Sequence, residues 1–69
     1  MSYVTNEIHG PFISEGIFQV ADTLDDAIVR LQEFSDRNGY TLIGEKDGDA
    51  YDAMAFKGKT AIQYTIEKL

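Results

Sequence analysis

The spacing of the apolar residues changes period twice along this chain, and this change sets the order of its secondary structure. Between residues 24 and 34 apolar residues recur at steps of three and four, as on the buried stripe of an amphipathic helix. They are Leu24, Ala27, Ile28, Leu31 and Phe34. Asp22 or Thr23 can cap the first turn, and Asn38-Gly39 can end the last one. We therefore expect one helix whose apolar stripe covers a sheet.

Candidate strands lie on both sides of this helix, and those that follow it show the two-residue alternation typical of strands buried on one side. Tyr3 to Ile8 allows a short strand, and Phe12 to Ala21 predicts a bent one. After the helix, turns at Asp47-Gly48-Asp49 and Lys57-Gly58-Lys59-Thr60 separate further strands. These strands are Tyr40 to Glu45, Tyr51 to Lys57 and Ala61 to Leu69. We predict an α+β domain, one helix packed on an antiparallel sheet of three to four strands, in the order β-α-β-β-β or ββ-α-β-β-β.

The last alternating segment indicates how the sheet is covered. Ile62, Tyr64 and Ile66 share one face, whereas polar residues share the other, so one side faces the core and one faces water. We also expect four aromatic residues in the core, namely Phe12, Phe18, Phe34 and Tyr64. If this last strand lies at the sheet edge, its unpaired backbone groups can add a strand from another chain, and we expect dimerisation there.

The length of 69 residues predicts a single domain over residues 1–69. In so short a chain, the burial of apolar surface only just offsets the loss of conformational entropy. Small domains usually add a disulfide, a metal ion or a second subunit, and this chain has no cysteine and one histidine. We therefore expect a homo-oligomer, most simply a homodimer, or a tight complex with another protein.

The net charge of −6 limits the kinds of partner that this chain can bind. The acidic excess lies in the first half of the chain, because Arg30 is the only lysine or arginine in residues 1–36. Nucleic acids and anionic membranes bind clustered Lys and Arg, so the excess of acid argues against both. It favours a partner protein with a basic surface, although an acidic surface also serves plain solubility. The first residues carry no basic cluster and no long apolar run, and cysteine is absent, so we expect a cytoplasmic protein.

Residues for catalysis or metal binding are sparse. The segment from Asp47 to Asp52 holds three carboxylates but lacks the glycine and the glutamate that a calcium loop requires. A nucleophilic triad would need His9 beside Ser14 or Ser35, and no local pattern orients such a set. We therefore expect no enzyme, no bound metal and no cofactor.

Two acidic surfaces are the candidate partner-binding sites. One is the polar face of the helix, and the other is the turn that precedes Tyr51. An exposed Tyr51 ring rimmed by carboxylates would form a hot spot for a basic partner, and the alternative is a ring that packs over the end of the sheet. The candidate residues are Asp25, Asp26, Glu33 and Asp36 on the helix and Asp47, Asp49, Tyr51 and Asp52 at the turn.

Two stretches of the chain resemble known small proteins. A strand, a Thr-Leu-Asp-Asp helix start, the segment Asn38 to Gly44 and the strand Tyr51 to Phe56 follow one another in residues 17–57. In this order the chain resembles small bacterial and phage domains of unknown function, which usually carry tryptophan at the position of Tyr40. The segment Val20 to Ala27 is similar to the strand-to-helix join of the small RNA polymerase inhibitors of T7-like phages. The resemblance implies a small protein that binds a larger one, and it brings no catalytic residue.

These patterns together predict a protein-binding module, an inhibitor or regulator of a larger protein. Two alternatives remain open at this point. One is a carrier of a small ligand, held in a pocket between subunits and lined by Tyr40, Tyr51 or Tyr64. The other is a structural protein that only self-associates, whose stability would depend on its concentration.

Overall fold

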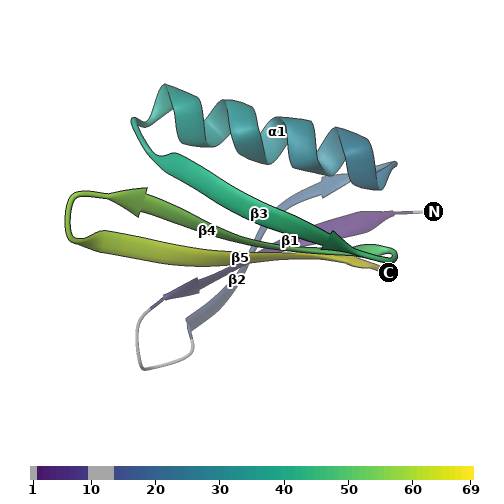
Figure 1. Cartoon of the computed structure of the whole chain (residues 1–69). Helices are drawn as coiled ribbons and strands as arrows, with labels where there is room; N and C mark the ends of the chain where they lie inside the picture. Colours follow the sequence, from purple (N-terminus) through teal and green to yellow (C-terminus); the bar gives the residue numbers. More distant parts are fainter. Residues whose placement is uncertain (1, 10–13) are drawn as a thin grey trace.

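The computed structural model describes residues 2–9 and 14–69, with the backbone alone described for residues 9 and 14–18. The chain forms two strands, a helix and three further strands (Figure 1). These elements are β1 (Tyr3–His9), β2 (Ser14–Ala21), α1 (Leu24–Arg37), β3 (Thr41–Asp47), β4 (Ala50–Lys57) and β5 (Thr60–Lys68). The α+β class and the ββ-α-β-β-β order are confirmed, but the sheet has five strands and not three to four.

The sheet is antiparallel throughout, with the strand order β2-β1-β5-β4-β3. The last strand, β5, is central and pairs with β1 on one side and β4 on the other. Our expectation of a free edge at the last strand is therefore wrong. The weakly patterned segment at the N-terminus is a full strand because both neighbours supply its backbone hydrogen bonds, and the edges of the sheet are β2 and β3.

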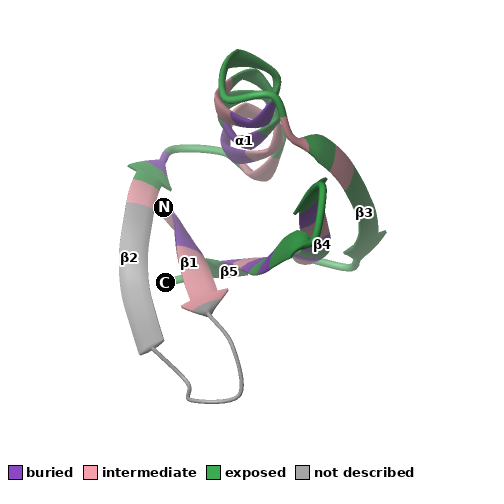
Figure 2. Cartoon of the chain, turned by 90° about the vertical axis from the view of Figure 1, so that its left-hand side faces the viewer, coloured by how far each residue is buried: buried purple, intermediate pink, exposed green. Residues whose placement is uncertain are grey.

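Helix α1 begins and ends as its sequence predicts. The Thr23 hydroxyl accepts a hydrogen bond from the backbone N–H of Asp26 at 3.0 Å, which satisfies a free donor of the first turn. Gly39 has a φ of +76° just after the last turn, where glycine adopts the left-handed conformation without strain. The helix lies over one side of the sheet, and β2 and β3 curve towards it along the two edges (Figure 2). Among the described elements, no helix covers the other side of the sheet.

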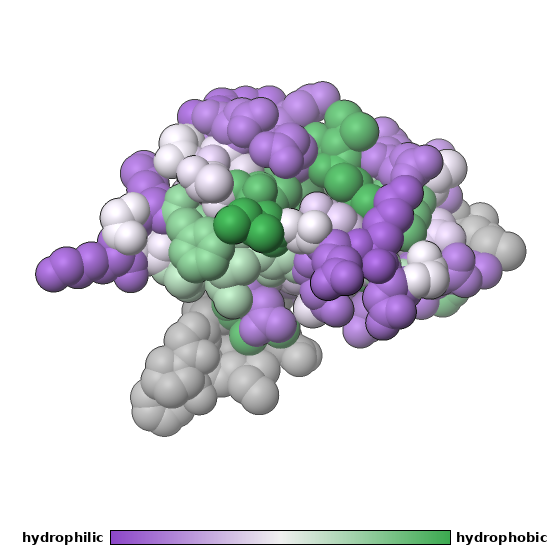
Figure 3. Space-filling model, viewed as in Figure 1, coloured by the Kyte–Doolittle hydropathy of each residue, from purple (hydrophilic) through white to green (hydrophobic). Residues whose placement is uncertain are grey.

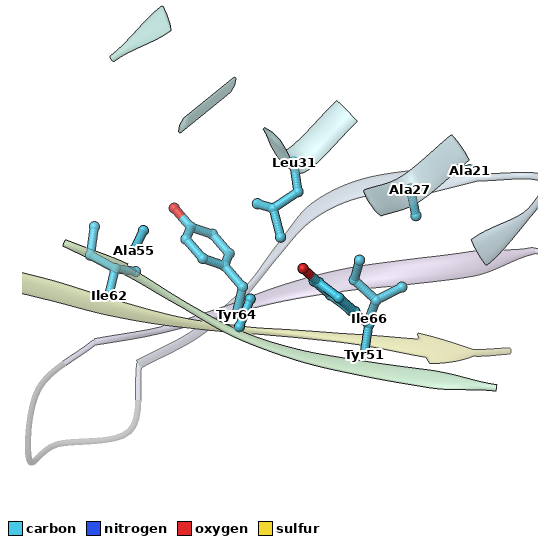
Figure 4. Packing of buried hydrophobic residues seen from close by; sticks show 9 residues of the cluster. Ala21, Ala27, Leu31, Tyr51, Ala55, Ile62, Tyr64 and Ile66 are labelled. Carbon is cyan, nitrogen blue, oxygen red and sulfur yellow. The ribbon is translucent and has the colours of Figure 1, made fainter. Parts of the chain in front are cut away.

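The hydrophobic core fills the space between α1 and the sheet. Tyr51 and Tyr64 rise from neighbouring strands towards Leu31 of the helix (Figure 4). The buried cluster consists of Ala21, Ala27, Leu31, Tyr51, Ala53, Ala55, Ile62, Tyr64 and Ile66. Phe34 is half-buried and packs against this cluster, as the sequence predicts. Phe12 and the side chain of Phe18 lie outside the described part of the chain.

Both predicted hairpin turns after the helix are confirmed. Each turn has two central residues. The first turn joins the paired residues Asp47 and Ala50, and the second joins Lys57 and Thr60. Gly48 and Gly58 stand first in these turns with φ values of +60° and +59°, a conformation that glycine adopts at little cost. The turns set the register of β3, β4 and β5, and this register decides which side chains meet on the uncovered side.

Candidate binding surface

The uncovered side of the sheet, which we call the open face, carries side chains in rows that cross the strands. Its residues alternate along each strand with those that face α1. Asp47 opposite Ala50 begins one row at the end of β3, and the strand register gives three further rows across the middle of the sheet. They are Thr41, Phe56 and Ala61; Ile43, Met54, Gln63 and Ile8; and Glu45, Asp52, Thr65 and Asn6.

The first two rows contain an apolar patch formed by Ile43, Met54 and Phe56. Ile43 is 64% exposed and Phe56 is 41% exposed, although both are large apolar residues. Met54 is half-buried and lies directly opposite Ile43 in the register. Apolar atoms gather over β3 and β4 in the middle of the surface in Figure 3 and are bordered by hydrophilic atoms. Single exposed apolar residues are normal, but a contiguous patch with a polar rim is typical of an interaction site.

The third row contains an acidic pair, Glu45 on β3 and Asp52 on β4. The two carboxylates occupy directly opposite positions, and both residues are exposed. Like charges in such positions repel each other and destabilise the sheet. The chain retains this repulsion at a place where a polar, uncharged side chain would fit the strand equally well.

The strand lysines do not neutralise the acidic pair because they occupy the alternate positions. Lys46 reaches the carboxylate of Asp25 on α1 at 2.8 Å. The ammonium of Lys57 donates to the backbone oxygen of Asn38 at 3.1 Å and lies 5.5 Å from the centre of the Tyr40 ring. Among the described side chains of β3 and β4, the positive charges thus face α1 and the open face is negative.

A shallow hollow joins the apolar patch to the acidic pair. It has a volume of about 490 Å³ and opens broadly to solvent. Its lining is formed by Ile43, Gly44, Glu45, Asp52, Ala53, Met54 and Gln63. One ligand seated there would contact apolar and carboxylate groups together.

The four candidate residues on the helix are largely engaged within the molecule. Asp25 pairs with Lys46, and Asp26 pairs with Arg30 at 3.2 Å, the four-residue spacing that stabilises helices. Asp36 accepts a hydrogen bond from the side-chain amide of Gln32 at 2.9 Å. Glu33 is exposed. Asp25 and Asp26 thus already have cationic partners, whereas neither Glu45 nor Asp52 forms an ion pair among the described residues.

The candidate residues at the turn are divided between two faces. Asp47 and Asp49 are exposed at the β3–β4 turn, and Asp52 belongs to the open face. Tyr51 is only 9% exposed, because its side chain points to the opposite side and packs over Gly44. The interpretation of Tyr51 as an exposed hot spot is therefore wrong, and the alternative of a ring packed over the sheet is confirmed. Tyr64 is likewise 1% exposed, so these two tyrosines are core residues and do not line a pocket between subunits.

The sequence interpretation missed Glu45 and the apolar patch. The alternation already puts Ile43 and Glu45 on the same face of β3. It likewise puts Asp52, Met54 and Phe56 on the same face of β4. It does not say which residues of the two strands stand opposite each other. A count of residues on both sides of the Gly48 turn would have revealed the facing carboxylates.

A hydrogen bond between two side chains joins β1 and β5 on the helix side of the sheet. The Tyr64 hydroxyl donates a hydrogen bond to a carboxylate oxygen of Glu7 at 3.3 Å. Burial, together with the negative charge of Glu7, raises the pKa of Tyr64 well above its ordinary value. This hydroxyl therefore keeps its proton to a higher pH than an exposed tyrosine does, and it acts as a donor inside the core.

The described part of the chain shows no group of three or more His, Cys, Asp or Glu side chains that could hold a metal ion. Of the residues considered for a nucleophilic triad, Ser35 is fully buried, and the side chains of His9 and Ser14 lie outside the described residues. No described helix combines the length and the apolar character needed to cross a bilayer. Comparison of the chain with protein families, curated proteins and solved structures finds no match.

Proposed function

We propose that this protein is a binding module that holds a partner protein on its open face and acts as a small inhibitor or regulator of that partner. One observation carries the proposal: the exposed apolar patch directly adjoins the acidic pair, with a hollow between them. The complementary partner surface presents an apolar side chain flanked by lysine or arginine. Such a surface would bury the patch and neutralise both carboxylates in the same contact.

The energetics favour this surface. Burial of exposed apolar area stabilises a complex by about 25 cal/mol per Å² before the costs of association. A basic side chain placed between Glu45 and Asp52 would also relieve their mutual repulsion, so part of the binding energy comes from strain present in the free protein. The net charge of −6 also attracts a basic partner over a distance, and this attraction raises the association rate at low salt.

The acidic helix residues are a weaker candidate for the same function. Asp25 and Asp26 would have to give up ion pairs with Lys46 and Arg30 before they could bind a new cation. Exposed pairs of this kind contribute little to stability, but they reduce the local negative potential. The two surfaces differ enough to be separated by mutation.

The proposal can be tested with a short synthetic peptide in which lysine alternates with leucine. The variant Glu45→Gln/Asp52→Asn removes the acidic pair, and Glu33→Gln/Asp36→Asn removes the same number of charges from the helix. We expect the first variant to weaken peptide binding about tenfold, which corresponds to about 1.4 kcal/mol, and the second to change it little. Equal losses in both variants would show general charge attraction and would refute a site on the open face.

Nuclear magnetic resonance can locate the bound peptide directly. Amide shifts should concentrate in β3 and β4 and remain small along the outer face of α1. Phe56→Ser should weaken binding, because the ring belongs to the apolar patch of the open face. A peptide with glutamate in place of lysine is the control for the apolar contribution, and we expect it not to bind.

A further inference from the structure

The two edges of the sheet differ in how well they could accept another strand. The pairing of β3 with β4 is unbroken from Thr41 opposite Phe56 to Asp47 opposite Ala50. The pairing of β2 with β1 shifts between Thr5 and Asn6, which marks a bulge or irregularity. Bulges and irregular edges hinder the addition of a strand, whereas a regular edge permits it. The regular edge of this sheet is β3.

The backbone of β3 is accessible to a second strand. Every residue of the strand except Leu42 is exposed. Gly44, at its centre, has no side chain, so its exposure is an exposure of the backbone itself. Because hydrogen-bonded and non-hydrogen-bonded pairs alternate along an antiparallel ladder, every second residue of β3 turns its N–H and C=O groups to the free edge. These groups can pair with another strand without any rearrangement of the sheet.

We propose that two copies of this chain pair antiparallel through β3, with Gly44 of one copy opposite Gly44 of the other. The two sheets would then join into one, related by a two-fold axis that passes between the glycines. This is the one symmetric register that pairs all seven residues of β3. Such a contact is self-complementary, as a two-fold interface must be.

The charges along β3 support a second copy as the occupant. In the register centred on Gly44, Thr41 stands opposite Asp47 of the second copy, and Ile43 stands opposite Glu45. Leu42 stands opposite Lys46, so no pair sets two like charges against each other. Every charged residue of the strand thus meets an uncharged one, although the strand carries three charges within its last three residues.

The contact is small, so the dimer should be weak. Seven paired residues at about 3.4 Å each span roughly 24 Å. A contact along one strand edge of this length buries little surface, so its buried area lies at the low end for specific protein interfaces. Strand pairing lies in the plane of the sheet and leaves the open face uncovered. The inference therefore does not rest on the proposed function, and either can fail without the other.

Sedimentation equilibrium of the full chain tests the proposal through paired charge variants at the exposed residue Thr41. Thr41→Glu sets a second carboxylate opposite Asp47 of the other copy, whereas Thr41→Lys sets a cation there. Because the symmetric contact contains this pair twice, we expect the first variant to weaken the dimer several-fold and the second to tighten it several-fold. Thr60→Glu and Thr60→Lys make the same charge changes away from the edge and measure the general effect of net charge.

Several outcomes would overturn the proposal. A wild-type chain that sediments at 7.7 kDa even at about 1 mM would exclude the dimer. Thr41 variants that both shift the equilibrium in the same direction, or that match their Thr60 counterparts, would exclude this register. A spin label on Thr41→Cys provides a second measurement, since the two labelled backbones should lie roughly 20 Å apart, six residues along paired strands. Sedimentation is measured without the lysine–leucine peptide, and the peptide test uses no variant at Thr41, so failure of the dimer and failure of the open-face site are told apart by separate measurements.

Discussion

The ring of Tyr51 lies across Gly44 on the neighbouring strand, in the space where a side chain at Gly44 would stand. Tyr51 is directly paired with Lys46, and Gly44 with Ala53, so the two residues are diagonal neighbours on the helix side of the sheet. The absence of a side chain at Gly44 is therefore what allows Tyr51 to enter the core. The same absence leaves the backbone of β3 open on its free edge.

Gly44→Ala should destabilise the protein, because the new Cβ atom would overlap the hydroxyl and ring carbons of Tyr51. Overpacking of this kind costs about 1–3 kcal/mol. Urea denaturation of the variant measures the loss. In a Tyr51→Ala background the ring is gone, and we expect Gly44→Ala to be neutral or stabilising. An equal cost in both backgrounds would mean that the contact with Tyr51 is not the cause.

Glu45→Gln should stabilise the protein, because it removes a carboxylate that directly faces Asp52. The expected gain is about 0.2–1 kcal/mol at low salt, and it should shrink as salt screens the repulsion. Glu33→Gln on the helix makes the same change of net charge and serves as the control. A Glu45→Gln variant that is no more stable than Glu33→Gln would contradict the repulsion. Stabilisation accompanied by weaker peptide binding would show that the acidic pair is kept for function.

Thr5→Val should also stabilise the protein. Thr5 is fully buried, and its hydroxyl has no hydrogen-bond partner among the described residues. Valine has nearly the same shape, so the change removes a buried unsatisfied polar atom and leaves the packing intact, with an expected gain of about 1 kcal/mol. Thr65→Val on the neighbouring strand is the matched control, since Thr65 is half-buried on the open face. Thermal unfolding of both variants should show a higher midpoint for Thr5→Val alone; a lower midpoint would mean that the hydroxyl has a partner in solution.

Stability should fall at alkaline pH through Tyr64. Burial and the nearby charge of Glu7 raise the pKa of Tyr64, so the folded state keeps this proton at pH values where the unfolded state loses it. The contribution is present in full below about pH 10, the ordinary pKa of tyrosine, and is lost as the pH rises further. Urea denaturation across this range should show a shallower decline for Tyr64→Phe than for the wild type. Tyr40→Phe also removes one tyrosine and is the control, and an unchanged slope in Tyr64→Phe would disprove the assignment.

Much of the fold could be read from local patterns. The helix cap at Thr23, the end of the helix at Gly39 and both hairpin turns depend on residues a few positions apart, so the sequence sufficed to place them. The assignment of Tyr64 and its neighbours on β5 to the covered side followed from two-residue alternation. The error in strand number came from β1, whose mixed composition carries little periodic signal. Its place between β2 and β5 is set by contacts with residues far along the chain.

The sequence by itself determined the class of the fold, the position of the helix and the side of β5 that faces the core, because these follow from periodicity and local capping. Tertiary structure alone decided that β5 is central, that β3 is a free and regular edge, and that Tyr51 is buried over Gly44. It also placed Glu45 opposite Asp52 beside Ile43 and Met54. The physical reason is that pairing between strands depends on register, and a shift of one residue along a strand would send the same side chains to the opposite face.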